Sequence, residues 1–384
     1  MIGDHLDIYT FQRLLEDALR LVPDTVDKRQ GAIIWDTLSV GSVQLAEAYI
    51  QLKGFYLSTN VLTAAGEDLD LKVAERGISR LEATSAVKLA MFYGTDGTPA
   101  AVPLGSRFST ARDTNALIYA VSGIYTNPTT GETVPGGYRL TCETPGTVGN
   151  DYIGALIPVT FLNHVATATM SDLLIPGREV ESDDSLRGRY LELVNYPPFG
   201  GNVSQYRQWV LQMDGVGAVQ IFPVWQGGGT VKVNILGADY SPASGTLIQD
   251  VQTAMDPETN HGEGLGLAPI GHFVTVGTPS VLAINVEAAI SLTNATIAQV
   301  QTAVEAAISF YLLSLRRDFG ASIDLLAHPI PVYRARIISE ILSVPGVENV
   351  TNLLLNGVDA DMLLDASAVA QQIPVDGTVI LHEV

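Results

Sequence analysis

The spacing of the apolar residues changes twice along this chain of 384 residues. Up to about residue 86, apolar side chains recur every three or four positions, which is the spacing of an amphipathic α-helix. Between residues 87 and 178, apolar and polar side chains alternate in short runs separated by Gly- and Pro-rich turn signals, as in a β-rich domain. Helical and alternating stretches then follow one another to the end of the chain. We therefore expect an α+β protein with several domains.

Four regions are expected from these changes. A helical N-terminal region spans residues 1–86, and a β-rich middle domain spans residues 87–178. An α/β domain occupies residues 179–278, and a C-terminal α/β domain occupies residues 279–384. Several domains suit this length, because single hydrophobic cores seldom grow beyond about 250–300 residues.

The N-terminal region contains two expected helices, one ending at Pro23 and a longer one beginning near Ile33. The longer helix carries apolar residues close to a single stripe: Ile34, Leu38, Leu45, Tyr49, Leu52 and Tyr56. Two interpretations of this stripe remain open. Either it packs in the core of this protein, or it packs on sister helices of other chains.

Two segments of the C-terminal half share a local pattern. Residues 209–219 and 338–350 both predict a helix, a turn at a Gly-Val pair and then a strand, which indicates two related α/β units. Residues 297–315 carry a strong helical stripe. The last segment, residues 373–381, predicts a pair of strands joined by a turn at Asp376-Gly377.

Charge limits the possible partners. The chain has 41 Asp and Glu but only 21 Lys and Arg, a net charge of −20, and its only adjacent basic pairs are Lys28-Arg29 and Arg316-Arg317. A nucleic-acid-binding surface needs clustered cations, and an acidic surface is repelled by anionic lipids. No run of about 18 uncharged apolar residues occurs, and no basic and apolar leader follows Met1. We expect a soluble protein that binds neither nucleic acid nor membrane.

The low proportion of charge favours protein partners. Charged residues make up only 16% of the chain and hydrophobic residues 47%, whereas average soluble proteins have about 25% charged residues. Large interfaces with other proteins would cover such a surface. A large core beneath a surface rich in Ser, Thr and Asn is the alternative.

The histidines are poorly arranged for metal binding, because no two of them have the four-residue spacing of a zinc-binding helix. They are His5, His164, His261, His272, His328 and His382. His261 lies near Glu258 and Glu263 in a Gly-rich loop, which is more typical of a solvated loop than of a metal site.

The densest acidic run precedes an expected helix and consists of Glu179, Glu181, Asp183 and Asp184. Helix capping and the helix dipole explain these carboxylates better than a pair of catalytic acids does. Ser182 or Asp183 is expected to cap the helix. Arg187 and Arg189 are expected to pair locally with Glu181 or Asp183.

Cys142 is the only cysteine, so no intrachain disulfide and no multi-cysteine zinc site can form. Its β-rich surroundings favour a buried thiol over a nucleophile. The chain has no G-x-S-x-G elbow and no GxxxxGK[ST] phosphate loop, and the glycines of residues 262–266 lack a Rossmann context. We expect a protein that is not an enzyme, without catalytic residues, cofactor-binding residues, metal ligands, cofactors or a small-molecule substrate.

Several motifs, read in order, resemble the baseplate J family of contractile phage tails and phage-tail-like particles. They lie at residues 29–36, 65–70, 75–80, 102–108, 145–150, 177–189, 200–202, 206, 209 and 214–216. The best single match is residues 177–189, GREVESDDSLRGR. Arg178 departs from the pattern, because relatives often have a second glycine there. Each motif is moderately specific, whereas their shared order over most of the chain is strongly specific.

The resemblance implies a structural wedge component of a tail baseplate. Two copies of such a protein join one smaller wedge protein, and six wedges form a ring that surrounds the hub and opens on contraction. The implied partners are a second copy, the smaller wedge protein, and the sheath-initiator and hub proteins. The N-terminal helices would contact neighbouring proteins, and the C-terminal domains would meet between copies, with residues 297–315 near that contact. The implied location is the tail baseplate of a virion or particle, after assembly in the cytoplasm of the bacterial host.

Two other functions remain as alternatives. The first is a host receptor- or glycan-binding tail protein that uses exposed aromatic residues of the β-rich domain, with Tyr119, Tyr125 and Tyr138 as candidates. The second is a cell-wall hydrolase carried on a tail, which lacks a recognisable acid/base pair. The resemblance applies equally to infectious phages, bacteriocins and injection particles.

Overall fold

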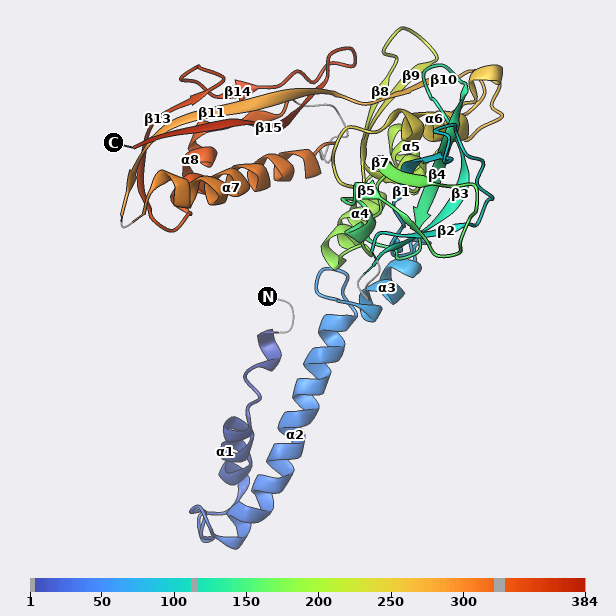
Figure 1. Cartoon of the computed structure of the whole chain (residues 1–384). Helices are drawn as coiled ribbons and strands as arrows, with labels where there is room; N and C mark the ends of the chain where they lie inside the picture. Colours follow the sequence, from blue (N-terminus) through green and yellow to red (C-terminus); the bar gives the residue numbers. More distant parts are fainter. Residues whose placement is uncertain (1–3, 112–115, 294, 321–328, 384) are drawn as a thin grey trace. The chain divides into compact units, whose positions relative to one another are not determined.

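The computed structural model describes residues 4–111, 116–293, 295–320 and 329–383 (Figure 1). Helices and several sheets occur in the same chain, so the expected α+β class is confirmed. The chain divides into two compact units. The first joins the N-terminal residues up to Leu81 with Glu181–Asn195, and the second contains Glu82–Val180 and Tyr196–Val384. This division differs from the expected boundary at residue 179, because the helix that follows Glu181 belongs with the N-terminal helices.

The first unit is helical. Its elements are η1 (Asp4–Leu6), α1 (Phe11–Leu21), α2 (Ile33–Ser58), α3 (Glu67–Ala74) and α4 (Asp183–Asn195). The Thr10 hydroxyl caps α1 by accepting a hydrogen bond from Arg13 N at 3.4 Å. α1 ends before Pro23, since the residue preceding a proline is biased away from helical geometry. α2 has 26 residues, about 39 Å of helix. Both helices expected from the sequence are confirmed.

A small core joins α3 and α4. Its buried members are Ala64, Leu69, Val73, Ile78 and Leu186. The inward side chains of α3 come from positions four residues apart, which lie on one face of a helix. This core lies between segments more than 100 residues apart in sequence, and it holds α4 in the first unit.

The β-rich part of the second unit is one antiparallel sheet of seven strands in the order β5-β7-β1-β4-β3-β2-β6. The strands are β1 (Val87–Tyr93), β2 (Arg107–Ser109), β3 (Ile118–Thr126), β4 (Thr133–Cys142), β5 (Gly154–Ala155), β6 (Ile157–Pro158) and β7 (Thr167–Ile175), with η2 (Thr147–Gly149) between β4 and β5. In β1 every second residue is buried, as the alternation predicted. Thr84 and Arg178 form an antiparallel bridge where the chain enters and leaves this domain.

Two smaller sheets follow, each of three strands. The first has the order β10-β9-β8, and the second has the order β13-β11-β15. The elements around the first sheet are α5 (Val203–Leu211), β8 (Val216–Pro223), β9 (Thr230–Gly237), α6 (Gly245–Met255), η3 (Glu258–Asn260) and β10 (Phe273–Gly277). The elements around the second are β11 (Ser280–Leu292), α7 (Ile297–Arg317), β12 (Pro331–Val332), α8 (Arg334–Leu342), β13 (Val347–Leu355), β14 (Met362–Leu363) and β15 (Gln372–Glu383).

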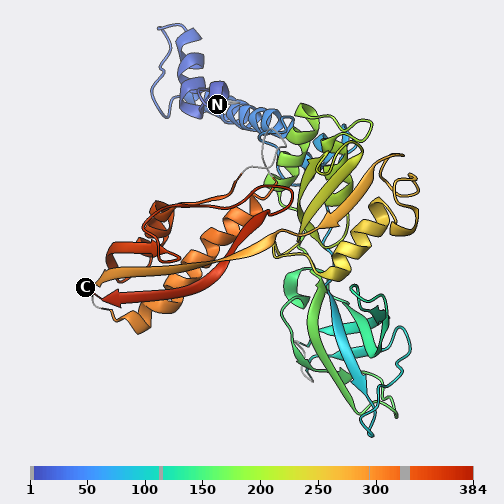
Figure 2. The same cartoon turned by 90° about the horizontal axis from the view of Figure 1, so that it is seen from above.

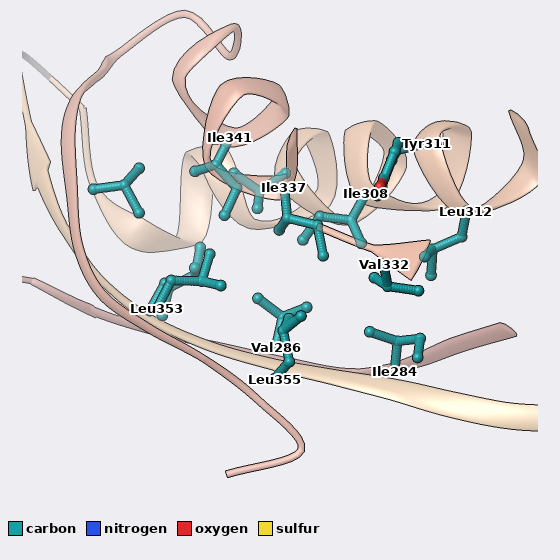
Figure 3. Packing of buried hydrophobic residues seen from close by; sticks show 14 of the residues in the cluster. Ile284, Val286, Ile308, Tyr311, Leu312, Val332, Ile337, Ile341, Leu353 and Leu355 are labelled. Atoms are coloured by element: carbon teal, nitrogen blue, oxygen red, sulfur yellow. The ribbon is translucent and has the colours of Figure 1, made fainter. Parts of the chain in front are cut away.

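The largest core lies between the second small sheet and helices α7 and α8 (Figure 3). Ile284 and Val286 of β11 point toward Ile308 and Leu312 of α7. The helical stripe expected at residues 297–315 supplies the helix side of this core, so that prediction is confirmed. The opposite face of β11 carries exposed side chains.

The two expected α/β units share their local geometry. Gly215 separates α5 from β8, and Gly346 separates α8 from β13, and both glycines have a positive φ, 83° and 96°. In both sheets the strand after this glycine lies antiparallel to the central strand, and the third strand lies parallel to it. The order of the connections differs, since β9 follows β8 directly whereas β11 precedes α8.

The predicted turn at Asp376-Gly377 is wrong. β15 is one strand from Gln372 to Glu383, parallel to β11 (Figure 2). A bulge in β15, where Gly377 and Thr378 lie opposite Asn285 of β11, absorbs the irregularity, and the Asn285 side chain accepts a hydrogen bond from Thr378 N at 2.9 Å. A Cβ at Gly377 would lie 2.6 Å from Ile284 O, so glycine is required here for close backbone approach rather than for a turn.

Among the residues that the structure describes, no helix combines the length and the apolarity that crossing a bilayer requires.

Candidate functional site

The face of α2 that meets α1 is narrow. Ser42 and Ala46 are the buried residues of α2, and Leu15 is the buried residue of α1. Tyr49, on the same face of α2, stacks on Tyr9 with the ring centroids 4.1 Å apart. Contact with α1 therefore buries one side of α2 only.

The rest of α2 exposes two apolar stripes. The first stripe consists of Val40, Val43 and Ile50, and the second of Leu45, Leu52 and Phe55. Within each stripe the residues are three or seven positions apart, the spacing at which helices pack on one another. Ile50 is 71% exposed and Phe55 is 67% exposed. Of the stripe that the sequence predicted, Leu45, Leu52 and Tyr56 are exposed. The Tyr56 ring contacts the His5 ring edge to face, so packing within this chain does not explain Leu45 and Leu52.

A network of ion pairs holds α4 to α3. Arg80 Nη2 lies 2.7 Å from Asp70 Oδ1 and 2.7 Å from Asp183 Oδ1. Asp183 also accepts a hydrogen bond from Gly66 N at 3.0 Å, at the start of α3. The pKa of Asp183 is lowered by that backbone hydrogen bond and by Arg80. The pKa of Arg80 is raised, mainly by its hydrogen bond with Asp70.

Arg187 fixes the connection between α2 and α3. Its Nε donates to Val61 O at 2.9 Å, and its Nη2 donates to Ala64 O at 2.8 Å. Its Nη1 lies 2.7 Å from Asp184, whose side chain is 97% exposed. The segment that best matches the family motif, residues 177–189, therefore supplies the contacts that fix α2 to the base of its unit.

The acidic run serves these structural contacts. Ser182 Oγ accepts from Ser185 N at 3.3 Å, which confirms one of the two expected caps of α4. Glu181 pairs with Arg189 at 2.6 Å, as expected, but it does so with a buried carboxylate. Glu179 accepts from Thr147 N at 2.7 Å, and this backbone hydrogen bond, with that of the Thr147 hydroxyl, lowers the pKa of Glu179.

His261 does not meet the carboxylates that its sequence position suggested. Its Nδ1 lies 2.8 Å from Asp256, whose carboxylate is almost fully buried. Glu263 instead accepts from Asn260 Nδ2 at 2.8 Å. The described part of the chain contains no group of three or more His, Cys, Asp or Glu placed to hold a metal ion. His328 lies outside the described residues.

The Cys142 thiol is buried, as expected, and burial raises its pKa. Two of the aromatic residues considered for host binding are also buried, so that assignment is wrong. Tyr119 donates from its hydroxyl to Gly149 O at 2.9 Å, and Tyr138 accepts from Val102 N at 2.9 Å. Both rings belong to the core of the seven-stranded sheet, where alternation places every second side chain inward. Tyr125 is half-buried.

Comparison with known sequences gives a consistent result. The model of the Baseplate J-like central domain matches residues 198–278, and the model of the Baseplate J-like protein C-terminal domain matches residues 284–380. The phage-like element PBSX protein XkdT of Bacillus subtilis (strain 168) is 33% identical over 358 residues, 92% of this chain and 93% of that protein. Baseplate protein gp47 of Escherichia phage Mu is 28% identical over 222 residues, 54% of this chain and 57% of that protein.

Among solved structures, a chain of the anti-feeding prophage baseplate is similar to this chain with a TM-score of 0.39 and 11% identity. The match covers 94% of this chain and 90% of that one. The sequence evidence decides the family, because XkdT is 33% identical over more than nine-tenths of both chains. The chain belongs to the baseplate J-like family of phages and phage-like elements.

Proposed function

We propose that this chain is a non-enzymatic structural component of the baseplate wedge of a contractile tail or contractile injection particle. The names of two relatives support this: gp47 is a baseplate protein of phage Mu, and XkdT belongs to the phage-like element PBSX. In this proposal two copies join one smaller wedge protein, and six wedges close a ring around the hub. Sheath-initiator and hub proteins are the other neighbours, and assembly takes place in the cytoplasm of the bacterial host.

The observation that carries the proposal is the pair of exposed α2 stripes. Full burial of a large aliphatic or aromatic side chain contributes about 1.5–3 kcal/mol. α2 leaves six such side chains uncovered on two sides, at the spacing of helix packing. Neighbouring helices of other wedge proteins would bury them, so we assign inter-subunit packing to residues 1–86.

The C-terminal α/β domain, residues 279–384, is assigned to the contact between copies. Its central strand β11 is covered by helices on one face and exposes side chains on the other. A one-sided sheet of this kind has a free face for a second copy. These contacts have to rearrange when the ring opens on contraction, as interfaces with two packed states can.

The polar residues of the chain support a role without catalysis. The carboxylates of residues 179–184 serve helix capping and ion pairs, and His261 serves a buried Asp256. We therefore assign no catalytic, cofactor or metal role to any of these residues.

Co-expression with the proteins of the neighbouring tail genes tests this function. The triple variant V40Q/V43Q/I50Q removes the first stripe, and light scattering after size exclusion measures the mass of the complex. We expect wild-type chain to enter a complex with itself and a smaller partner, and the variant to remain folded but lose about tenfold or more of this complex. The matched control is Phe161→Gln, which removes an apolar side chain 80% exposed in the β-rich domain.

A wild-type chain that stays a lone monomer beside its neighbours would contradict the wedge assignment. A triple variant that assembles as well as the Phe161→Gln control would contradict the role of α2.

A further inference from the structure

Three loops of the second unit meet at one end of the sheet formed by β8, β9 and β10. They span residues 197–202, 224–229 and 256–272, the last shown in gold at the right of Figure 2. A Cβ on Gly201 would lie 2.6 Å from Pro269, so the first and third loops touch. A Cβ on Gly229 would lie 2.9 Å from Gly271 O, so the second and third loops touch as well. The three loops therefore form one continuous surface.

Each loop exposes a large apolar side chain on this surface. Phe199 is 82% exposed, Val224 61%, Leu265 67% and Ile270 82%. We call these four residues the loop patch. Single exposed apolar side chains are normal, but several on adjoining loops mark a place where a partner binds.

Buried polar side chains beneath the loop patch fix the third loop in place. The buried Asp256 carboxylate accepts from Gly262 N at 2.9 Å and lies 2.8 Å from His261 Nδ1. The hydroxyl of Tyr206, which is also buried, lies 2.8 Å from His272 Nδ1. A surface fixed in this way loses little conformational entropy on binding, which is the property of a preformed docking site.

The charge around the patch identifies the kind of partner. The three loops contain no Lys or Arg, and they expose Glu258 and Glu263. In a two-fold contact with a second copy, each patch would face itself, and like charges would meet. Nucleic acid and anionic lipid would be repelled for the same reason. A different protein with basic residues around an apolar segment fits both the apolar and the acidic parts.

We propose that the loop patch is a preformed docking surface for another protein of the same particle, one that presents apolar side chains flanked by Lys or Arg. The inference rests on the proposed function, because it assigns a partner surface to a baseplate component. It adds a contact distinct from the α2 stripes, on the central rather than the N-terminal part of the chain.

Photo-crosslinking in the assembled particle tests the partner's chemistry. Ile270→p-benzoylphenylalanine places the reactive group in the patch, and Phe161→p-benzoylphenylalanine places it on an exposed site of the β-rich domain as the control. After irradiation of purified particles, mass spectrometry identifies the crosslinked peptides. We expect position 270 to join a peptide of a different particle protein in which Lys or Arg adjoins an apolar residue, and position 161 not to join that peptide.

Three results would overturn the proposal: a crosslink from position 270 to this same chain, a crosslink to a peptide without Lys or Arg, or no crosslink although the chain is in the particle. Absence of the chain from purified particles contradicts the proposed function instead, so the two failures are distinguishable.

Charge reversal gives a second, independent measurement. The variant E258K/E263K changes exposed side chains that the fold does not bury, and its melting temperature checks that it is folded. We expect its copy number per particle to fall by about tenfold or more. The control Glu132→Lys reverses an exposed charge on the β-rich domain and should leave the copy number unchanged. Equal incorporation of both variants would count against the basic partner.

Discussion

Glu181 and Arg189 form a two-point ion pair at the start of α4, with Arg189 Nε 2.7 Å from Glu181 Oε1 and Arg189 Nη2 2.6 Å from Glu181 Oε2. The Glu181 side chain is 4% exposed. The same carboxylate accepts from Leu81 N at 3.1 Å and from the Ser185 hydroxyl at 2.9 Å. One buried carboxylate therefore joins α4 to the segment that follows α3.

Removing this carboxylate is expected to destabilise the first unit. Glu181→Gln leaves Arg189 without its charged partner, and breaking one side of a buried pair costs about 3–5 kcal/mol. Because Arg189 is partly exposed, we expect the lower end of this range. Urea unfolding followed by circular dichroism measures the change. The control Asp184→Asn removes an exposed carboxylate and should cost no more than about 1 kcal/mol. Equal losses in both variants would contradict the role of the buried pair.

Acid should weaken the ion-pair network formed by Asp70, Arg80 and Asp183. The pKa of Asp183 is lower in the folded chain, because Gly66 N and Arg80 stabilise the ionised carboxylate. This stabilisation is complete above the unfolded pKa, about 3.9, and is lost as the pH falls through the lower folded value. We expect the melting temperature of wild-type protein to fall more steeply below about pH 4 than that of Asp183→Asn. A variant with the wild-type slope would show that Asp183 does not drive the acid sensitivity.

The glycine between α8 and β13 should tolerate no side chain. Gly346 has a φ of 96°, and a Cβ there would lie 2.9 Å from the Ala295 Cβ. Gly357, with a φ of 78°, has open space around its Cα. Gly357→Ala should cost only the backbone strain, about 1–2 kcal/mol, and Gly346→Ala should cost more. Thermal unfolding measures the loss of stability in both variants. A smaller loss for Gly346→Ala than for Gly357→Ala would refute the packing argument.

Truncating a buried side chain of α1 should destabilise the chain more than truncating an exposed side chain of α2. Leu15→Ala removes a buried side chain of α1 and is expected to lower the free energy of unfolding by about 2–3 kcal/mol. Ile50→Ala removes an exposed side chain of α2 and should change it by less than about 0.5 kcal/mol in the isolated chain. Chemical denaturation at low protein concentration measures both. A large loss for Ile50→Ala would show that this side chain is already covered.

Local periodicity predicted the elements whose partners are close in sequence. The stripe of α7 and the Gly-Val turns after α5 and α8 could be read from the chain, because a helix or a turn is fixed within a few residues. The predicted pairing of Arg189 with Glu181 is also local. The attachment of α4 to the N-terminal helices is not local, since it depends on Arg80 and Asp183, 103 residues apart.

Three further features needed the three-dimensional structure. Asp-Gly is a common hairpin turn. In this chain the next residue, Thr378, donates its backbone N–H to the Asn285 side chain of β11, 93 residues away in sequence. This contact keeps β15 continuous. Asp256, the partner of His261, has no sequence signal that sets it apart from other acidic residues. The stripe of α2 was ambiguous because burial inside a chain and burial between chains require the same spacing.

The bridge between Thr84 and Arg178 has a consequence for how this protein can change. The two residues exchange backbone hydrogen bonds of 3.0 and 3.2 Å, so the domain between them begins and ends at one place. A domain with adjacent ends can grow, shrink or be exchanged without lengthening the chain on either side. We therefore expect changes of length within residues 85–177 to leave the contacts between α3 and α4 intact, because Asp70, Arg80 and Asp183, which make those contacts, lie outside this segment.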